Sequence, residues 1–287
     1  MNGVRRQTLR SPAEIRGRGL FSGAPARAVI TPAPAGHGVG FEARGVTFPA
    51  LVTHVPPCDP NSRGRARWTT LSGGGASVMT VEHLLSALRG LGVTDALVSV
   101  EGPEVPILDG SAEVFVDAVA AGGGLEPLAG EAQAIIVREP IEARDDTGAW
   151  IRADPLRGPH MEYRYTLDYG PGAAIAPATA VWDGGAATYQ VEVAPARTYC
   201  LASEAAALRA AGLFADLSPR DFLVLDDATG RPIENTLRFP DEPARHKLLD
   251  LIGDLSLIGR PILARVTAYK SGHALAHAFA RRVLELY

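Results

Sequence analysis

The sequence predicts an α+β fold of two similar domains, in which each domain is a sheet covered by helices. Strand-like segments come first in each half of the chain, and helix-like segments follow them. The order helix, strand, helix then occurs twice, over residues 83–121 and again over residues 246–286. Strands followed by helices are typical of antiparallel sheets with helices on one face, and a repeated order is typical of a duplicated fold.

The boundary between the halves is predicted in the stretch AAGGGLEPLAGEAQ, residues 120–133. This stretch is rich in small residues, contains Pro127 and has no hydrophobic periodicity. A helix-like segment precedes it and a strand-like segment follows it. We therefore expect a first domain over residues 1–126 and a second domain over residues 127–287.

The elements of the two halves correspond in order. In the first half, strand-like residues 26–54 precede HLLSALRGLG, ALVSVE and SAEVFVDAVAA, which read as helix, strand and helix. In the second half, strand-like residues 134–143, 161–169 and 187–196 precede HKLLDLIGDLSLIG, ILARVTAYK and HALAHAFARRVLEL. Gly110 follows His83 by 27 positions and Gly272 follows His246 by 26, so the loops before the second helices also correspond.

An additional segment interrupts the second half at about residues 199–227. It reads as the end of a strand, an alanine-rich helix (SEAAALRAAGL), a loop and the strand DFLVLDD. Because the first half has no counterpart, we expect this insertion to serve a specific ligand.

Composition and charge exclude several classes of protein. Of 287 residues 46% are hydrophobic, which is enough for a sizeable core. The net charge of −4, from 28 basic and 32 acidic residues, gives no general attraction to nucleic acid or to an anionic membrane. Only Cys58 and Cys200 are present, and no segment approaches the ~18 apolar residues of a membrane span. We therefore expect a cytoplasmic protein that binds no nucleic acid and has no signal peptide.

One predicted helix, ARHKLLDLIGDLSLIG at residues 244–259, has charged side chains among apolar ones. A proline before it and a glycine at its end suit a helix of about four turns. His246, Asp250 and Asp254 lie along one stripe, and the other faces are apolar. A helix that is apolar on nearly every side is buried, so its carboxylates must be hydrogen-bonded, paired or bound to metal.

A metal site is one arrangement that would pair these groups. His246 and Asp250 are spaced i, i+4, which places both side chains within reach of one ion, although the spacing also fits a histidine that simply hydrogen-bonds an aspartate. His83 in TVEHLL is the candidate third ligand. Thr80 is the expected N-cap of that helix, and Glu82, in its first turn, could be an ordinary solvated glutamate.

A second histidine pair, His273 and His277 in SGHALAHAF, has the same i, i+4 spacing. Asp254 lies one turn beyond Asp250, where it cannot easily share the same ion but can orient a neighbouring imidazole. We expect His273 to be a protonated catalytic histidine beside Asp254. We expect His277 to be an incidental surface residue of the terminal helix.

Five motifs together closely resemble the bacterial UDP-3-O-acyl-N-acetylglucosamine deacetylase (LpxC) family, the zinc enzymes of lipid A synthesis. In chain order they are TVEHLLSALRGLG, PEVPILDGSA, ARTY, RHKLLDLIGDL and AYKSGHAL, and they extend over nearly the whole chain. The resemblance implies two α+β domains with the helices sandwiched between the two sheets. It also implies a monomer that acts on a UDP-linked acylated amino sugar, with no more than transient contact with the inner membrane surface.

The resemblance further implies a role for each candidate residue. The zinc (Zn²⁺) ligands would be His83, His246 and Asp250, with a position left for water. Zinc lowers the pKa of bound water toward ~7 and polarises a carbonyl group, and Glu82 would be the general base. The other catalytic and substrate-binding residues would be Thr198 of ARTY, His273 of SGHA with its partner Asp254, and Lys247.

In the family, the insertion forms a passage for the acyl chain of the substrate. The side chains that could line such a passage here are Tyr199, Leu201, Leu213, Phe214 and Phe222. Each of them could equally belong to the ordinary core of a small subdomain.

Two regions depart from the family pattern. The chain reads GLFSG, with Phe21 and Ser22, where the family usually has GLHTG, and LFADLSPRDFLVL where the family usually has a glycine-rich GGS segment before an asparagine-containing strand. Both regions approach the substrate in the family. Two alternatives therefore stay open: a zinc-dependent deacetylase of another N-acetylated, nucleotide-linked sugar, and a non-catalytic binding protein on the same scaffold.

Overall fold

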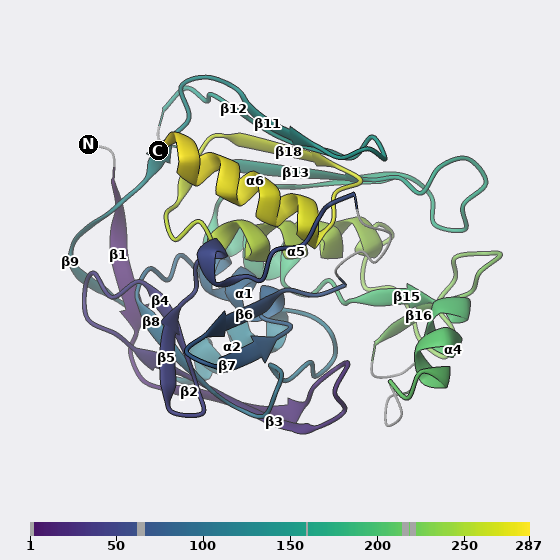
Figure 1. Ribbon diagram of the computed structural model, residues 1–287, viewed down its shortest axis with the longest axis horizontal. Coiled ribbons are helices and arrows are strands. Elements are labelled where there is room, and N and C mark those ends of the chain that lie inside the picture. The colour runs from purple at the N-terminus through teal and green to yellow at the C-terminus, as the bar shows by residue number, and fades with distance from the viewer. Residues whose placement is uncertain (1–2, 62–66, 159, 214–217, 219–221) are drawn as a thin grey trace.

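The computed structural model places a layer of helices between two five-stranded sheets (Figure 1). It describes residues 3–61, 67–158, 160–213, 218 and 222–287. The α+β class and the arrangement of helices sandwiched between sheets are therefore confirmed. None of the helices within the described residues is both long enough and apolar enough to span a bilayer.

The two large sheets have the same topology. The first has the order β2-β3-β8-β4-β5, from β2 (Ala13–Arg18), β3 (Pro25–Pro32), β4 (Val39–Ala43), β5 (Val46–Pro49) and β8 (Ala96–Glu101). The second has the order β11-β12-β18-β13-β14, from β11 (Ile141–Arg144), β12 (Trp150–Asp154), β13 (Glu162–Leu167), β14 (Ala178–Trp182) and β18 (Arg265–Tyr269). In each sheet the strand that comes last in the sequence, β8 or β18, lies in the centre. It is antiparallel to one neighbour and parallel to the other. The repeat expected from the sequence is thus present in the sheets.

Four long helices fill the layer between the sheets (Figure 1). They are α1 (Glu82–Leu91), α2 (Glu113–Ala121), α5 (Glu242–Ser256) and α6 (His273–Leu286). Helix α5 begins with proline in its first turn, as expected, and ends at Ser256, three residues before the expected Gly259. Helices α1 and α5 approach so closely at Gly253 that only glycine fits there. A Cβ atom on this residue would lie only 2.0 Å from the carbonyl oxygen of Glu82.

The stretch predicted as a boundary is in part a strand. Strand β9 (Leu125–Gln133) pairs antiparallel with β1 (Gly3–Leu9), although most of its side chains are exposed. Backbone pairing needs no hydrophobic pattern, so periodicity could not reveal this strand. Where the chain divides into domains stays a prediction.

Short elements complete the fold. Strands β6 (Thr70–Gly73) and β7 (Ala76–Met79) form a hairpin, and β10 (Ile135–Ile136) pairs with β17 (Ile262–Leu263). A single 3₁₀ turn, η1 (Val52–His54), follows β5. One main hydrophobic core combines side chains of both large sheets and all four long helices, including Phe41, Phe115, Trp182, Leu248 and Phe279.

The strand expected over residues 187–196 is a wrong prediction. Residues there form a short α-helical turn, α3 (Ala186–Thr188), and a π-helical turn, η2 (Tyr189–Val193). Tyr189 and Val193, four residues apart, are both buried, and the Tyr189 hydroxyl donates a hydrogen bond to Ser86 at 2.8 Å. The segment alternates polar and apolar residues over too short a distance to separate a strand from a helix with one buried face.

The insertion in the second half has the expected order of elements. Strand β15 (Tyr199–Leu201) leads into α4 (Ala202–Ala210), and β16 (Leu223–Leu225) returns parallel to β15. A small separate hydrophobic cluster lies beneath these elements, and it includes Phe21, Cys200 and Phe222. Burial raises the pKa of the Cys200 thiol to about 12, so this cysteine is an apolar packing residue.

Candidate functional site

Helix α5 presents three polar side chains on one buried face. His246, Asp250 and Asp254 follow one another at four-residue spacing, and none is more than 5% exposed. The predicted buried stripe is therefore confirmed. Helix α1 brings His83 to the same place, because its first turn packs against α5 at Gly253.

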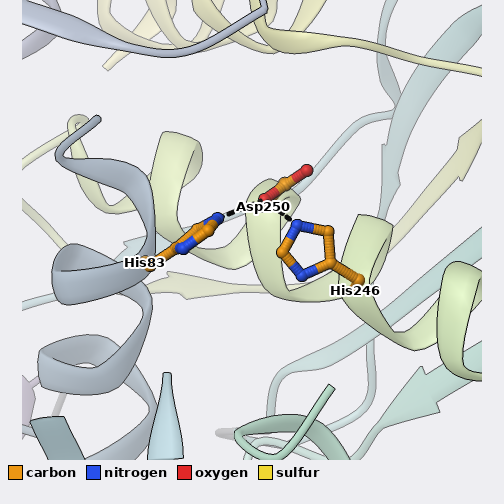
Figure 2. A group of neighbouring side chains, drawn as sticks. All are labelled: His83, His246 and Asp250. Atoms are coloured by element: carbon orange, nitrogen blue, oxygen red, sulfur yellow. Dashed lines mark ion pairs between the residues drawn. The ribbon is translucent and has the colours of Figure 1, made fainter. Parts of the chain in front are cut away.

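His83, His246 and Asp250 converge so that their ligand atoms all lie within 4.8 Å of one another (Figure 2). Asp250 Oδ1 lies 3.5 Å from His83 Nε2 and 3.3 Å from His246 Nε2. The planes of the two imidazole rings are nearly perpendicular. Two imidazole nitrogens and one carboxylate oxygen around a common point are a donor set that can hold a divalent metal ion.

The hydrogen bonds of these side chains also fit a metal ion. His246 Nδ1 lies 3.1 Å from the carbonyl oxygen of Ala196, so Nδ1–H donates there and the Nε2 lone pair faces the site. Asp250 Oδ2 accepts a hydrogen bond from Lys247 Nζ at 2.9 Å. Asp250 Oδ1 is buried without a hydrogen-bond partner in the described part of the chain. A buried carboxylate oxygen without a partner is costly, and a bound cation removes that cost.

The protonation states of His246 and Asp250 are those that a bound metal ion would require. Burial lowers the pKa of His246 to about 3, so its imidazole is neutral. Burial opposes ionisation of Asp250, but the Lys247 ammonium group, which also donates a hydrogen bond to it, outweighs burial and holds the pKa of that carboxyl well below its usual range. Metal ions bind neutral imidazole and ionised carboxylate.

Glu82 is buried at the start of α1, beside the three ligands. It is only 2% exposed, which excludes the alternative of a solvated first-turn glutamate. Its Oε2 accepts a hydrogen bond from the backbone N–H of Thr69 at 3.0 Å. Burial raises the pKa of Glu82 to about 7, although attraction to His273 and His83 acts to lower it. A carboxylate with a pKa near neutrality is suited to taking and returning protons.

The prediction that Thr80 caps α1 is wrong. Val81 occupies the N-cap position, and no side chain caps the helix there. The Thr80 hydroxyl instead donates to Glu104 Oε1 at 2.7 Å, and its backbone has a φ of 56°. Thr80 therefore cannot cap α1, because its hydroxyl proton satisfies a buried carboxylate.

His273 and Asp254 form the contact that the sequence predicts. His273 is the first residue of α6, and its Nδ1 lies 2.8 Å from Asp254 Oδ2. Burial disfavours the charged imidazole, but the charge of Asp254 and this hydrogen bond outweigh burial and raise the pKa of His273 to about 9. His273 is therefore a cation at neutral pH, and Asp254 is its counter-ion.

The prediction that His277 is an incidental surface residue is wrong. Only 2% of His277 is exposed, because α6 is covered by α5 on one side and by the second sheet on the other. His277 Nε2 lies 2.9 Å from Thr69 Oγ1 and 3.4 Å from Asp254 Oδ1. Both histidines of the i, i+4 pair therefore face the same aspartate.

A cavity of about 490 Å³ adjoins these groups and is lined by both polar and apolar side chains. The predicted site residues that line it are Glu82, His83, Thr198, Tyr199, Phe222, His246, Lys247, Asp250 and His273. Asp254 is not among them, but it contacts His273, which is. The structure thus brings together nearly all the residues that the five motifs singled out.

Contacts with neighbouring residues fix the positions of Thr198 and Lys247. The backbone N–H of Thr198 donates to the carbonyl oxygen of Gly110 at 2.8 Å, and a Cβ atom on Gly110 would lie 2.7 Å from Thr198 Cγ2. The Lys247 ammonium group bonds Asp250 and lies 5.9 Å from the centre of the Tyr199 ring. Both side chains therefore reach the cavity beside the metal ligands.

The five residues proposed for an acyl passage have different positions. Tyr199 and Phe222 line the cavity. Leu201 is not among its described lining residues, because it packs against the main core instead. Leu213 packs against the small cluster of the insertion, and Phe214 lies outside the described residues.

Comparison with known proteins assigns the family. A family model described as LpxC, UDP-3-O-acyl N-acetylglycosamine deacetylase, matches residues 6–285. The chain belongs to the LpxC family. The family resemblance of the five motifs is therefore confirmed over nearly the whole sequence.

Individual LpxC proteins are similar over almost their full lengths. The UDP-3-O-acyl-N-acetylglucosamine deacetylase of Anaeromyxobacter sp. (strain Fw109-5) is 38% identical over 97% of this chain and 88% of its own. The protein of the same name from Myxococcus xanthus (strain DK1622) is 37% identical over 97% of this chain and 86% of its own. The one from Synechocystis sp. (strain ATCC 27184 / PCC 6803 / Kazusa) is 35% identical over 98% of this chain and 99% of its own.

The first departure from the LpxC pattern has a structural explanation. The backbone N–H groups of Phe21 and Ser22 both donate to the buried Glu104 carboxylate, at 3.1 and 2.9 Å. The Phe21 ring packs against Trp68, with ring centres 4.3 Å apart, and lines the cavity. Backbone hydrogen bonds fix this loop, so its side chain can change without loss of the loop conformation.

Sequence reasoning missed several residues of this LpxC site. Thr69 bonds both Glu82 and Asp254, but it lies in no motif and nothing in the sequence marks it. Tyr169 also lines the cavity, and its hydroxyl lies 2.8 Å from that of Tyr199. Lys270, 3.3 Å from Asp168, lies within the motif AYKSGHAL, which could have indicated it.

Proposed function

We propose that this chain is a zinc-dependent hydrolase that removes the N-acetyl group from UDP-3-O-acyl-N-acetylglucosamine, a step of lipid A biosynthesis. The observation that carries the proposal is the meeting of a three-residue metal site and a buried glutamate at one cavity. Membership of the LpxC family supports the substrate, as do the names of the similar proteins.

Zinc is the ion that this donor set favours. His83, His246 and Asp250 would hold it, because two imidazoles and one carboxylate are a frequent ligand set of catalytic zinc, in which a further position stays open. When bound, zinc supplies Lewis-acid polarisation of the amide carbonyl and lowers the pKa of water.

Glu82 acts as the general base. Its carboxylate, with a pKa of about 7, takes a proton from the water molecule that attacks the acetyl carbon. A new C–O bond then forms, and the carbonyl oxygen takes on negative charge. Thr69 keeps one carboxylate oxygen of Glu82 hydrogen-bonded, so the other is free to accept the proton.

Thr198 and His273 stabilise the negative charge that develops. The Thr198 hydroxyl and the His273 imidazolium both line the cavity, and each can donate a hydrogen bond to the oxyanion. The C–N bond then breaks, acetate leaves, and the amine receives a proton from His273 or from Glu82. Asp254 keeps His273 protonated until that step.

Lys247, Tyr199 and Phe222 contact the substrate. The Lys247 ammonium group lies at the cavity beside the metal ligands, where it can attract the anionic part of a nucleotide sugar. Tyr199 and Phe222 give the insertion an apolar wall against which an acyl chain can lie. The enzyme works as a cytoplasmic monomer and meets the inner membrane surface only transiently.

A second candidate is a deacetylase of another N-acetylated nucleotide sugar. The apolar Phe21 ring at the cavity favours it, because the family usually has histidine there. Both candidates use the same metal site and the same base. They differ only in what the far side of the cavity accepts.

The test is a mass-spectrometric assay of acetate loss with zinc-loaded protein. Loss of one acetyl group from UDP-3-O-acyl-N-acetylglucosamine, and a much slower loss from the same sugar without its acyl chain, are the expected results. Glu82→Gln is the matched control, since it keeps the size of the side chain and removes the base. Loss only from other N-acetyl sugars would favour the second candidate, and no loss from any of them would overturn the proposed reaction.

A further inference from the structure

Asp254 is contacted from both sides by histidines of α6, and the mechanism uses only one of them. His273 Nδ1 lies 2.8 Å from Oδ2, while the Thr69 hydroxyl lies 2.5 Å from Oδ1. His277 Nε2 lies 2.9 Å from that hydroxyl and 3.4 Å from Oδ1. All four residues are at most 5% exposed.

The directions of these hydrogen bonds follow from the available protons. A carboxylate only accepts, so the single hydroxyl proton of Thr69 goes to Asp254. The Thr69 oxygen then has only lone pairs to offer His277, so Nε2 of His277 must be the donor. His277 therefore sets the rotation of the Thr69 hydroxyl, which in turn binds the aspartate.

Thr69 also reaches the general base. Its backbone N–H donates to Glu82 Oε2 at 3.0 Å, while its hydroxyl donates to Asp254. A continuous series of hydrogen bonds thus runs from Glu82 through Thr69 and Asp254 to His273. Glu82 and His273, the two groups proposed to exchange protons with the substrate, are thus linked through Thr69 and Asp254.

The buried position of His277 has an energetic cost that an apolar residue of similar size would avoid. Its Nδ1 is buried and has no hydrogen-bond partner in the described part of the chain. A leucine would fill the same face of α6 without leaving a polar atom unsatisfied. The useful property of the histidine here is its Nε2–H group.

We propose that His277 is a positioning residue that acts through Thr69 to fix the orientation of the Asp254 carboxylate and hence of the His273 imidazole. His277 does not touch the substrate, since it is not among the residues that line the cavity in the described part of the chain. The proposed effect on turnover rests on the deacetylase function proposed above. The hydrogen-bond network itself does not depend on that function.

The test compares three substitutions of His277, which distinguish the effect of its N–H donor from the effect of its side-chain volume. His277→Gln keeps an N–H group at about the reach of Nε2, His277→Asn places its amide at the position of Nδ1, and His277→Leu keeps only apolar volume. We expect the glutamine variant to retain most of its kcat, and the other two to lose about tenfold or more with KM and metal content unchanged. In His277→Leu combined with Thr69→Val, we expect no loss beyond that of Thr69→Val alone, because the histidine acts through the threonine.

A measurement without substrate separates this inference from the proposed function. The Nδ1 proton of His273, buried against Asp254, is expected to give a slowly exchanging downfield NMR signal in the intact metal-loaded protein, and to broaden in His277→Leu but not in His277→Gln. A signal equally sharp in all variants, or equal losses of kcat and melting temperature in all three, would overturn the positioning role. An unsubstituted protein that releases no acetate but keeps this NMR pattern would refute the deacetylase function alone.

Discussion

The close approach of α1 and α5 at Gly253 predicts that a single added methyl group damages catalysis. In Gly253→Ala, the new Cβ atom would lie 2.0 Å from the carbonyl oxygen of Glu82, whereas ordinary contacts begin at 3.4 Å. The helices must therefore separate by more than about 1 Å, and this moves the base away from its partners. The clash is with backbone, so rotation of a side chain cannot relieve it.

The magnitudes follow from two opposing effects. Overpacking of a rigid contact costs about 1–3 kcal/mol, and the better helix propensity of alanine offsets up to about 1 kcal/mol of that. We expect a net loss of about 1 kcal/mol in the free energy of unfolding, or about 2 °C in melting temperature. Displacement of the base by about 1 Å is expected to lower kcat by about a hundredfold.

Gly90→Ala is the matched control, on α1, the helix that carries Glu82. Its Cβ atom would lie 2.3 Å from the buried Tyr189 ring, at a point about 12 Å along α1 from Glu82. Thermal unfolding of both variants, with kcat measured per metal-loaded protein, separates loss of stability from displacement of the base. Equal kcat values in the two variants would refute the idea that contact at Gly253 positions Glu82.

Three further predictions concern the site itself. Glu82→Gln is expected to keep its metal and lose kcat by at least about a hundredfold, and full activity with full metal content would exclude its role as base. Asp250→Ala is expected to lose most of its bound metal after dialysis, by elemental analysis, and a full metal complement would exclude its role as ligand. Because the pKa of His273 in the folded protein, about 9, lies above its ordinary value of 6.5 in the unfolded chain, its pair with Asp254 contributes full stability below about pH 6.5 and loses it as pH rises through about 9. The melting-temperature difference between the unsubstituted protein and His273→Gln is therefore expected to shrink over that range, and a constant difference would contradict the assignment.

The candidate site could largely be predicted because its residues sit on strongly periodic helices. Four-residue spacing placed His246, Asp250 and Asp254 on one face, and the structure has them there. The contact of Asp254 with His273 followed from the same geometry together with the need to pair a buried carboxylate. Helical periodicity is therefore enough to predict which side chains lie together where they come from a single helix.

The missed features depend on contacts between distant segments. Thr69 meets Asp254 across 185 positions of sequence, and no local pattern marks it. His277 was misplaced because the burial of α6 on two sides depends on how the second sheet packs. The strand β9 and the turn η2 were missed for a related reason, since backbone pairing and a single buried helical face leave little trace in short segments.

The positions of the three proposed metal ligands in the chain would link metal supply to the stability of the fold. His83 comes from α1, while His246 and Asp250 come from α5, which begins 160 residues after the start of α1. An ion bound by all three would hold the two helices together in addition to their packing at Gly253. By mass action, free metal at about one hundred times its dissociation constant adds about 2.7 kcal/mol to the free energy of unfolding. Under the proposed function, a cell that lacks the metal would therefore hold a protein that is less stable as well as inactive, and proteolysis would remove it faster.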